Sequence, residues 1–281
     1  MRIAYVNGDY VPLNEARVSI LDRGFLFADG VYEVTSVLDG RLVDARVHLQ
    51  RLSCSLREIK LASPVPLAQI IDIEKQLVER NDLREGLIYF QITRGAAERD
   101  FGFPVDATPS LVMFNQEKSI VDSPAAHTGI AVVTVPDIRW PRRDIKSIAL
   151  LAQVLAKQAA IDAGAQDAWM HEDGVVTEGS SNSVYIVAQN GHIISRKPSS
   201  KVLDGLTRRA ILALAAESQM VVEEREFTIE EALRAKEAFF TSASAFVCPV
   251  VKIDDSVIGD GKPGPIAMRL RELYVDFARR S

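Results

Sequence analysis

The sequence has 281 residues, with 47% hydrophobic and 25% charged residues and a formal net charge of −5. This length suffices for two domains with full hydrophobic cores, and the acidic balance argues against a general nucleic-acid binder. With only 2 cysteines (Cys54 and Cys248) and 4 scattered histidines, neither a disulfide framework nor a metal site is expected. No stretch reads as a signal peptide or a membrane span, which favours a soluble cytoplasmic protein.

The first part of the chain mixes predicted strands and helices. The Asn7-Gly8 pair predicts a hairpin, and residues 31–37 read as a strand that turns at Asp39-Gly40. Residues 46–60 and 67–80 carry apolar positions at helical spacing, whereas residues 87–95 and 110–115 read as strands. Because strands and helices do not alternate strictly, residues 1–117 are predicted to form a small α+β domain. Residues 118–128 are the predicted interdomain linker, since they are mostly polar or small and include a proline.

Residues 129–281 are predicted to form a larger second domain. It begins with a strand, and an apolar helix pattern that includes Ile148, Leu151 and Leu155 follows and ends by Gly164. Thr207 is a plausible N-cap of a further helix, and Pro265 is predicted to begin a final helix that runs to about residue 280.

Lys146 and Glu178 lie at opposite ends of the segment around which the chain is organised, residues 141–182. A lysine and a carboxylate at one cavity are what pyridoxal phosphate chemistry needs. The lysine forms a Schiff base, and the carboxylate keeps the pyridine nitrogen protonated. From these two residues alone, a surface lysine and a strand-end glutamate is the safer interpretation.

A phosphorylated cofactor also needs donors for its phosphate. Leu206 and Thr207 follow the flexible Gly205 at a predicted helix N-terminus, and the small-residue segment 241–244 offers hydroxyls and close backbone approach. The Arg51 guanidinium could add a positive charge and two parallel hydrogen bonds to the phosphate. Each signal is weak by itself, and no nucleotide-binding glycine motif stands in the appropriate place.

Several motifs, taken together and in order, resemble the class IV (fold type IV) pyridoxal-phosphate-dependent aminotransferases, in particular those acting on D-amino acids. They are DRGFLFADGVYEV (22–34), HLQRL (48–52), RDIKS (143–147), TEGSSNS (177–183), LDGLTR (203–208) and FFTSAS (239–244). The resemblance spans nearly the whole chain. It implies a two-domain α+β fold with a C-terminal cofactor-binding domain, pyridoxal 5'-phosphate as cofactor, no metal, and a homodimer.

The resemblance also implies a role for each matching residue. Lys146 would form the Schiff base, Glu178 would pair with the pyridine nitrogen, and Tyr32 and Arg99 would bind the substrate. The residues implied to hold the rest of the cofactor are Arg51, Leu203, Leu206, Thr207, Ser242 and Ala243. Trp140 matches an aromatic residue near the substrate, and His48 would support Arg51.

One departure from the family pattern concerns the substrate carboxylate. The loop keeps Arg99, but Phe101 stands where D-amino-acid aminotransferases have a histidine, and a phenyl ring cannot donate a hydrogen bond. The expected reaction is transamination of D-amino acids, such as D-alanine or D-glutamate, with a 2-oxo acid acceptor such as 2-oxoglutarate or pyruvate. The alternatives on this fold are a branched-chain L-amino-acid or (R)-amine transaminase and an aminodeoxychorismate lyase. A non-catalytic cofactor binder and a structural domain are the remaining interpretations.

Overall fold

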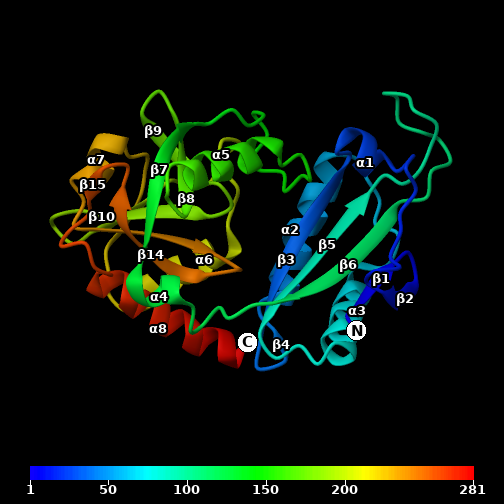
Figure 1. The fold of residues 1–281 in the computed structure, drawn as a ribbon, viewed down its shortest axis with the longest axis horizontal. Coiled ribbons are helices and arrows are strands. Elements are labelled where there is room, and N and C mark those ends of the chain that lie inside the picture. The colour runs from blue at the N-terminus through cyan, green and yellow to red at the C-terminus, as the bar shows by residue number, and fades with distance from the viewer. The chain divides into compact units, whose positions relative to one another are not determined.

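The computed structural model describes residues 1–281 and divides into two compact units (Figure 1). The first comprises Met1–Ser119, Ile145–Ala149 and Ser281, and the second comprises Ile120–Asp144 and Leu150–Arg280. The predicted domain ranges differ from these units in three respects: residues 120–128 of the predicted linker belong to the second unit, whereas Ser281 and the internal segment Ile145–Ala149 belong to the first. For Ile145–Ala149 there is a clear structural cause. The reason is backbone pairing: the Tyr32 N–H donates to the Lys146 carbonyl, and the Ile148 N–H donates to the Gly30 carbonyl.

The first unit is built on an antiparallel sheet of six strands in the order β2-β1-β6-β5-β3-β4. The strands are β1 (Ile3–Val6), β2 (Asp9–Pro12), β3 (Gly30–Leu38), β4 (Arg41–Leu42), β5 (Gly86–Thr93) and β6 (Ser110–Glu117). The two predicted hairpin turns are confirmed. Asn7-Gly8 and Asp39-Gly40 all have positive φ, the conformation that a tight two-residue turn requires.

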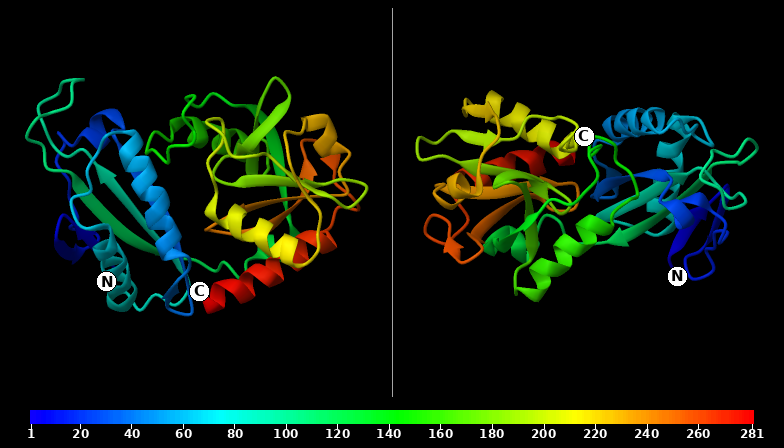
Figure 2. Two further views of the ribbon diagram at one scale, coloured as in Figure 1. Left: turned by 180° about the vertical axis from the view of Figure 1, so that it is seen from behind. Right: turned by 90° about the horizontal axis from the view of Figure 1, so that it is seen from above.

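Three helices accompany this sheet, namely α1 (Arg23–Phe27), α2 (Ala45–Glu58) and α3 (Leu67–Arg80). The two long helices lie on one face of the sheet (Figure 2). Their apolar positions, such as Leu52 and Leu77, pack with strand residues such as Phe90 in one buried core. Because strand side chains alternate between faces, the residues next to the core positions on β3 and β5 point away from the helices.

The second unit contains a mixed sheet of nine strands in the order β12-β11-β10-β13-β14-β7-β8-β9, with β15 paired to β14. The strands are β7 (Ile130–Pro136), β8 (Asp167–Glu172), β9 (Val175–Gly179), β10 (Ser183–Val187), β11 (Ile193–Ser195), β12 (Val222–Glu224), β13 (Glu237–Ser242), β14 (Phe246–Ile253) and β15 (Ser256–Val257). The helices are α4 (Pro124–Thr128), α5 (Leu151–Asp162), α6 (Leu206–Glu217), α7 (Ile229–Leu233) and α8 (Pro265–Arg280). The predicted linker therefore includes α4. None of the helices in the protein has the length and apolar character needed to cross a membrane.

Two predictions about helices in this unit were wrong. Helix α5 begins at Leu151, because Ile148 is held in extended pairing with β3. Its side chains Leu151 and Leu155 are 72% and 52% exposed, so the apolar pattern does not mark a core-facing stripe in this chain. Helix α6 begins at Leu206 with Gly205 as its N-cap, which places Thr207 inside the first turn rather than at the cap.

Candidate functional site

Lys146 is held beside β3 in the first unit. Its carbonyl accepts the Tyr32 N–H at 3.0 Å, and its own N–H donates to the Ser55 hydroxyl of α2 at 3.2 Å. This edge of β3 is open because β4 pairs only with Val37 and Leu38. The Lys146 Nζ lies 4.1 Å from the centre of the Tyr32 ring. The structure therefore brings the predicted Schiff-base lysine and the predicted substrate tyrosine together.

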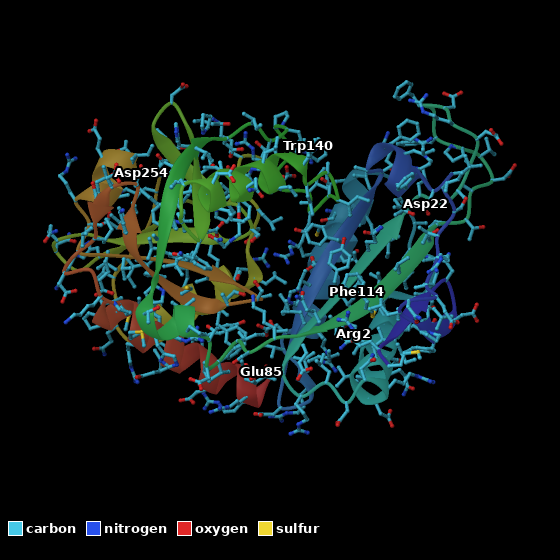
Figure 3. All side chains as sticks on the ribbon, in the orientation of Figure 1. Arg2, Asp22, Glu85, Phe114, Trp140 and Asp254 are labelled. Carbon is cyan, nitrogen blue, oxygen red and sulfur yellow. The ribbon has the colours of Figure 1, made fainter.

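An aromatic row extends from Tyr32 across the same face of the sheet. Tyr32 stacks on Tyr89 with ring centres 5.5 Å apart, and Tyr89 contacts Phe114 at 5.1 Å. Phe114 is labelled on β6 in Figure 3. The Tyr89 hydroxyl donates to Gln91, and burial raises the pKa of Tyr89, which keeps it a neutral donor. A lysine amine beside aromatic faces suits a planar, conjugated ligand.

Arg51 is anchored on the opposite side of β3. Its Nε and Nη2 atoms donate to the two carboxylate oxygens of Glu33 at 2.8 and 2.7 Å, and the His48 Nδ1 atom lies 2.8 Å from the same carboxylate. Burial raises the pKa of Glu33, but the charge and hydrogen bonds of Arg51 outweigh it, so its pKa lies well below the ordinary value. Glu33, which the sequence analysis missed, therefore holds Arg51 in a fixed orientation. The available signal was its place in the 22–34 motif, directly after Tyr32.

Glu178 is buried at the end of β9 in the second unit. Its carboxylate accepts hydrogen bonds from the Arg139 guanidinium and from the Leu203 N–H, the latter at 3.2 Å. Burial raises the pKa of Glu178, while Arg139 and the Leu203 N–H oppose that rise. A carboxylate so oriented and paired can accept a hydrogen bond from a protonated ring nitrogen.

Arg139 in turn belongs to a line of alternating charges. Its Nε and Nη2 atoms donate to Asp137, whose carboxylate also accepts the Thr177 hydroxyl at 2.6 Å. Arg143 reaches Asp137 at 3.3 Å and Glu172 at 2.8 Å. Burial raises the pKa of Asp137, but Arg139 and Thr177 outweigh it, so the net shift is downward.

Asp137 and Arg139 therefore orient the carboxylate of Glu178, the residue predicted to pair with the ring nitrogen of the cofactor. Neither residue was predicted from the sequence, although both stand shortly before the Lys146 motif. Trp140, beside Arg139, is 42% exposed on its loop (Figure 3), and no hydrogen bond or ring contact fixes its side chain.

The N-terminus of α6 forms a cradle in the same unit as Glu178. Gly205 approaches β10 so closely that an added Cβ would meet the Ser183 hydroxyl at 2.6 Å. Ser183 pairs with Thr241 on β13, which leads directly into Ser242 and Ala243. Hence the first turn of α6 lies near the small-residue turn after β13. The predicted phosphate residues of this unit, which these two segments carry, are Leu206, Thr207, Ser242 and Ala243.

Each unit supplies groups that pyridoxal 5'-phosphate requires. The twelve-residue helix α6 has no side-chain cap and no acidic residue in its first turn, so its N–H groups and positive dipole end are left for an anion such as a phosphate. The buried Glu178 suits the ring nitrogen, and Lys146 supplies a primary amine. By contrast, no group of three or more His, Cys, Asp or Glu side chains is arranged to hold a metal ion.

Arg99, the second predicted substrate residue, lies in the loop between β5 and β6 of the first unit. Its guanidinium carbon lies 5.3 Å from the Phe27 ring centre and 5.7 Å from the Phe101 ring centre. Phe101 is 79% exposed. The Arg99 guanidinium therefore lies beside two phenyl rings that contact each other, with ring centres 5.4 Å apart.

Comparison with known proteins places these observations in a family. Residues 30–253 match the family model for amino-transferase class IV. The D-alanine aminotransferase of Staphylococcus haemolyticus is 38% identical over 272 residues, which cover 97% of this chain and 96% of that protein. The D-alanine aminotransferase of Bacillus licheniformis is 38% identical over 267 residues, or 94% of this chain and 93% of that protein.

Solved structures give the same fold. A branched-chain amino acid aminotransferase from T.th., solved with pyridoxamine 5'-phosphate, matches with a TM-score of 0.91 at 25% identity, covering 100% of this chain and 95% of that one. The branched-chain amino acid aminotransferase of Escherichia coli also matches with a TM-score of 0.91, at 21% identity and with 99% and 94% coverage. The sequence-based expectations of a class IV, fold type IV enzyme are therefore confirmed.

Proposed function

Because the chain belongs to the class IV aminotransferases, a pyridoxal-phosphate-dependent family, we propose that it transfers the amino group of D-amino acids to 2-oxo acids. D-Alanine and D-glutamate are the proposed donors, and pyruvate and 2-oxoglutarate the proposed acceptors. The observation that carries this proposal is the 38% identity, over nearly the full length, to a D-alanine aminotransferase. The branched-chain enzymes that share the fold are less similar in sequence, at 25% identity or below in the two comparisons above.

The proposed assignment of cofactor residues follows the chemistry of each group. The first turn of α6 and the turn at Ser242 and Ala243 would bind the phosphate, and Arg51 of the first unit is proposed as an additional cation. Leu203 would pack against the ring, and Glu178 would accept a hydrogen bond from the ring nitrogen. When bound, pyridoxal phosphate supplies an electron sink for the bonds of the substrate α-carbon.

Lys146 is the proposed base of the reaction. Its Nζ atom would form the covalent bond that holds the cofactor, and as a free amine it would accept and return the substrate α-proton. The contact with the Tyr32 ring limits where the Nζ atom can lie. Glu178 favours the proton transfer by keeping a negative charge next to the ring nitrogen, which holds that nitrogen protonated.

Arg99 and Tyr32 are the proposed substrate-binding residues. Arg99 offers a charge-assisted hydrogen bond to the α-carboxylate. Phe101 replaces the hydrogen-bond-donating histidine of the D-amino-acid aminotransferase pattern, so binding of the substrate carboxylate depends more heavily on Arg99. The substrate pocket is also more tolerant of neutral (R)-amines. A homodimer and a cytoplasmic location complete the proposal, and the presence of only 2 cysteines, far apart in the sequence, supports the location.

The test is a half-reaction in the absence of acceptor. Purified enzyme loaded with pyridoxal phosphate is mixed with D-alanine, D-glutamate, L-leucine or (R)-1-phenylethylamine, and conversion to the pyridoxamine form is followed by absorbance. The proposal expects the fastest conversion with a D-amino acid and release of the matching 2-oxo acid. Faster conversion with L-leucine would establish the branched-chain alternative. Pyruvate release from aminodeoxychorismate, without any of these conversions, would establish the lyase.

A further inference from the structure

Residues 95–108 of the first unit form a loop whose two ends meet. Gly95 has φ +87°, and an added Cβ would lie 1.9 Å from the Thr108 carbonyl oxygen, so only glycine permits this approach. Near the start of the loop the Ala97 N–H donates to the Leu21 carbonyl. The closed base alone does not fix the tip that carries Arg99. Contacts from buried side chains do so instead.

Arg23, at the start of α1, holds the backbone of the tip. Its side chain is 4% exposed. The Nη1 atom donates to the Asp100 carbonyl at 2.5 Å, and the Nη2 atom lies 3.4 Å from the Phe101 carbonyl. These acceptors flank Arg99 on its C-terminal side. The third guanidinium nitrogen, Nε, donates to the Asp29 carboxylate at 2.8 Å.

Arg94, just after β5, contacts the loop at Phe103. Its guanidinium carbon lies 3.7 Å from the centre of the Phe103 ring. The same side chain donates to the Ile59 and Lys60 carbonyls, just beyond the end of α2. Its Nε and Nη2 atoms bind the Asp29 carboxylate at 2.8 and 3.0 Å.

Asp29 is thus the common acceptor for the buried guanidiniums of Arg23 and Arg94, which contact the loop at different residues. Burial raises the pKa of Asp29, but the hydrogen bonds and charges of Arg94 and Arg23 outweigh it, and the net shift is downward. The carboxylate is therefore ionised at neutral pH and neutralises one of two adjacent positive charges. Without the Asp29 charge, two positively charged guanidiniums would lie close together in a poorly solvated site. The free-energy cost of these unpaired buried charges favours a different conformation of both arginine side chains.

We propose that Asp29 is a positioning residue for the substrate-binding loop, acting through Arg23 and Arg94 to set the conformation in which Arg99 is presented. The effect on substrate rests on the proposed function, because it takes Arg99 as the residue that binds the α-carboxylate. The effect on the loop conformation is independent of the proposed function. Removing the Asp29 charge loosens the backbone from Asp100 to Phe103 without altering any residue assigned to the cofactor.

The experiment compares Asp29→Asn and Arg23→Lys with the wild-type holoenzyme. Asparagine keeps the shape but not the charge of Asp29. Lysine keeps the charge of Arg23, but a single ammonium cannot bond the carboxylate and the two loop carbonyls in the same fork geometry. Asp106→Asn is the matched control, because Asp106 is exposed in the same loop and makes none of these contacts. Far-UV circular dichroism verifies that each variant is folded.

Two readouts are measured for each variant. Hydrogen exchange of the amides at 97–103 is expected to accelerate at least about tenfold in Asp29→Asn and Arg23→Lys, which corresponds to losing one charge-assisted hydrogen bond, whereas β6 amides exchange as in wild type. The KM for D-alanine is expected to rise about tenfold with kcat changed less than about twofold, since the cofactor residues are untouched. Asp106→Asn should behave as wild type in both.

The outcomes separate the proposal from the function it builds on. Folded variants with wild-type loop exchange would overturn the positioning role, whatever their activity. Faster loop exchange with an unchanged KM would show that the loop does not serve the D-amino acid and would also overturn it. If the wild type does not act on D-alanine, the proposed function fails, and the exchange result alone decides whether Asp29 orders the loop. If Asp29→Asn does not fold, Arg23→Lys decides by the same two readouts.

Discussion

Replacing the buried Glu74 of α3 by glutamine is expected to make the protein more resistant to alkaline unfolding. Glu74 is 1% exposed, and neither of its carboxylate oxygens nor the Thr35 hydroxyl makes a well-formed hydrogen bond. Burial raises the pKa of Glu74 to about 8. The nearby Thr35 side chain opposes the rise, and the Glu33 charge adds to it. Glu74 is therefore mostly neutral in the folded protein at pH 7.

The magnitude follows from the difference between the folded and unfolded pKa values. The ordinary glutamate value is 4.5, and the folded value is about 8. Because the folded value is the higher one, the stabilisation from protonated Glu74 is complete below about pH 4.5 and is lost progressively up to pH 8. Each pKa unit corresponds to about 1.4 kcal/mol, so between pH 5 and pH 9 the wild type loses up to about 4 kcal/mol relative to Glu74→Gln.

Urea unfolding at fixed pH values from 5 to 9, followed by far-UV circular dichroism, measures this difference. Glu79→Gln is the control, because Glu79 is exposed on the same helix. The free energy of unfolding of Glu74→Gln, relative to that of the wild type, should increase as the pH rises. The free energy of unfolding of Glu79→Gln should have the same pH dependence as that of the wild type. A difference between Glu74→Gln and wild type that stays constant from pH 5 to 9 would refute the reasoning, because Glu74 would then titrate alike in both states.

Other predictions concern the site itself. Glu178→Gln should retain the cofactor but lose most transamination, since an amide cannot hold the ring nitrogen protonated. Cofactor absorbance after dialysis and the half-reaction rate measure the two effects, and near-wild-type rates would exclude the role. Arg99→Ala should lower kcat/KM for D-amino acids about ten- to a hundredfold, and an unchanged value would make Arg99 an ordinary loop residue. Phe101→His should lower the KM for D-glutamate by supplying a second donor, and steady-state kinetics that show no gain would mean that Phe101 lies away from the carboxylate.

Local patterns in the sequence predicted many elements of the fold. The helix over residues 67–80 and the start of the last helix at Pro265 were located from apolar spacing and proline placement. Both hairpin turns in the first unit followed from Asn-Gly and Asp-Gly pairs, because these residues accept positive φ at little cost. Such features depend on neighbours a few residues apart, which a sequence displays directly.

Features that depend on distant residues could not be predicted in this way. Nothing near Ile148 shows that its N–H pairs with Gly30, so the start of α5 was placed too early. Glu33 and Asp29 look like ordinary acidic residues until the fold brings Arg51 and Arg94 to them. The candidate cofactor and substrate residues were proposed by family resemblance, whereas the carboxylates that orient them required the structure.

The most direct test of the account is to identify the lysine that bonds the cofactor. The holoenzyme is reduced with borohydride, digested and mapped by mass spectrometry. The account predicts a phosphopyridoxyl label on Lys146, together with loss of the bound-cofactor absorbance band in Lys146→Ala. A label on Lys157 or Lys201, or no label on any lysine of a protein that binds pyridoxal phosphate, would contradict it.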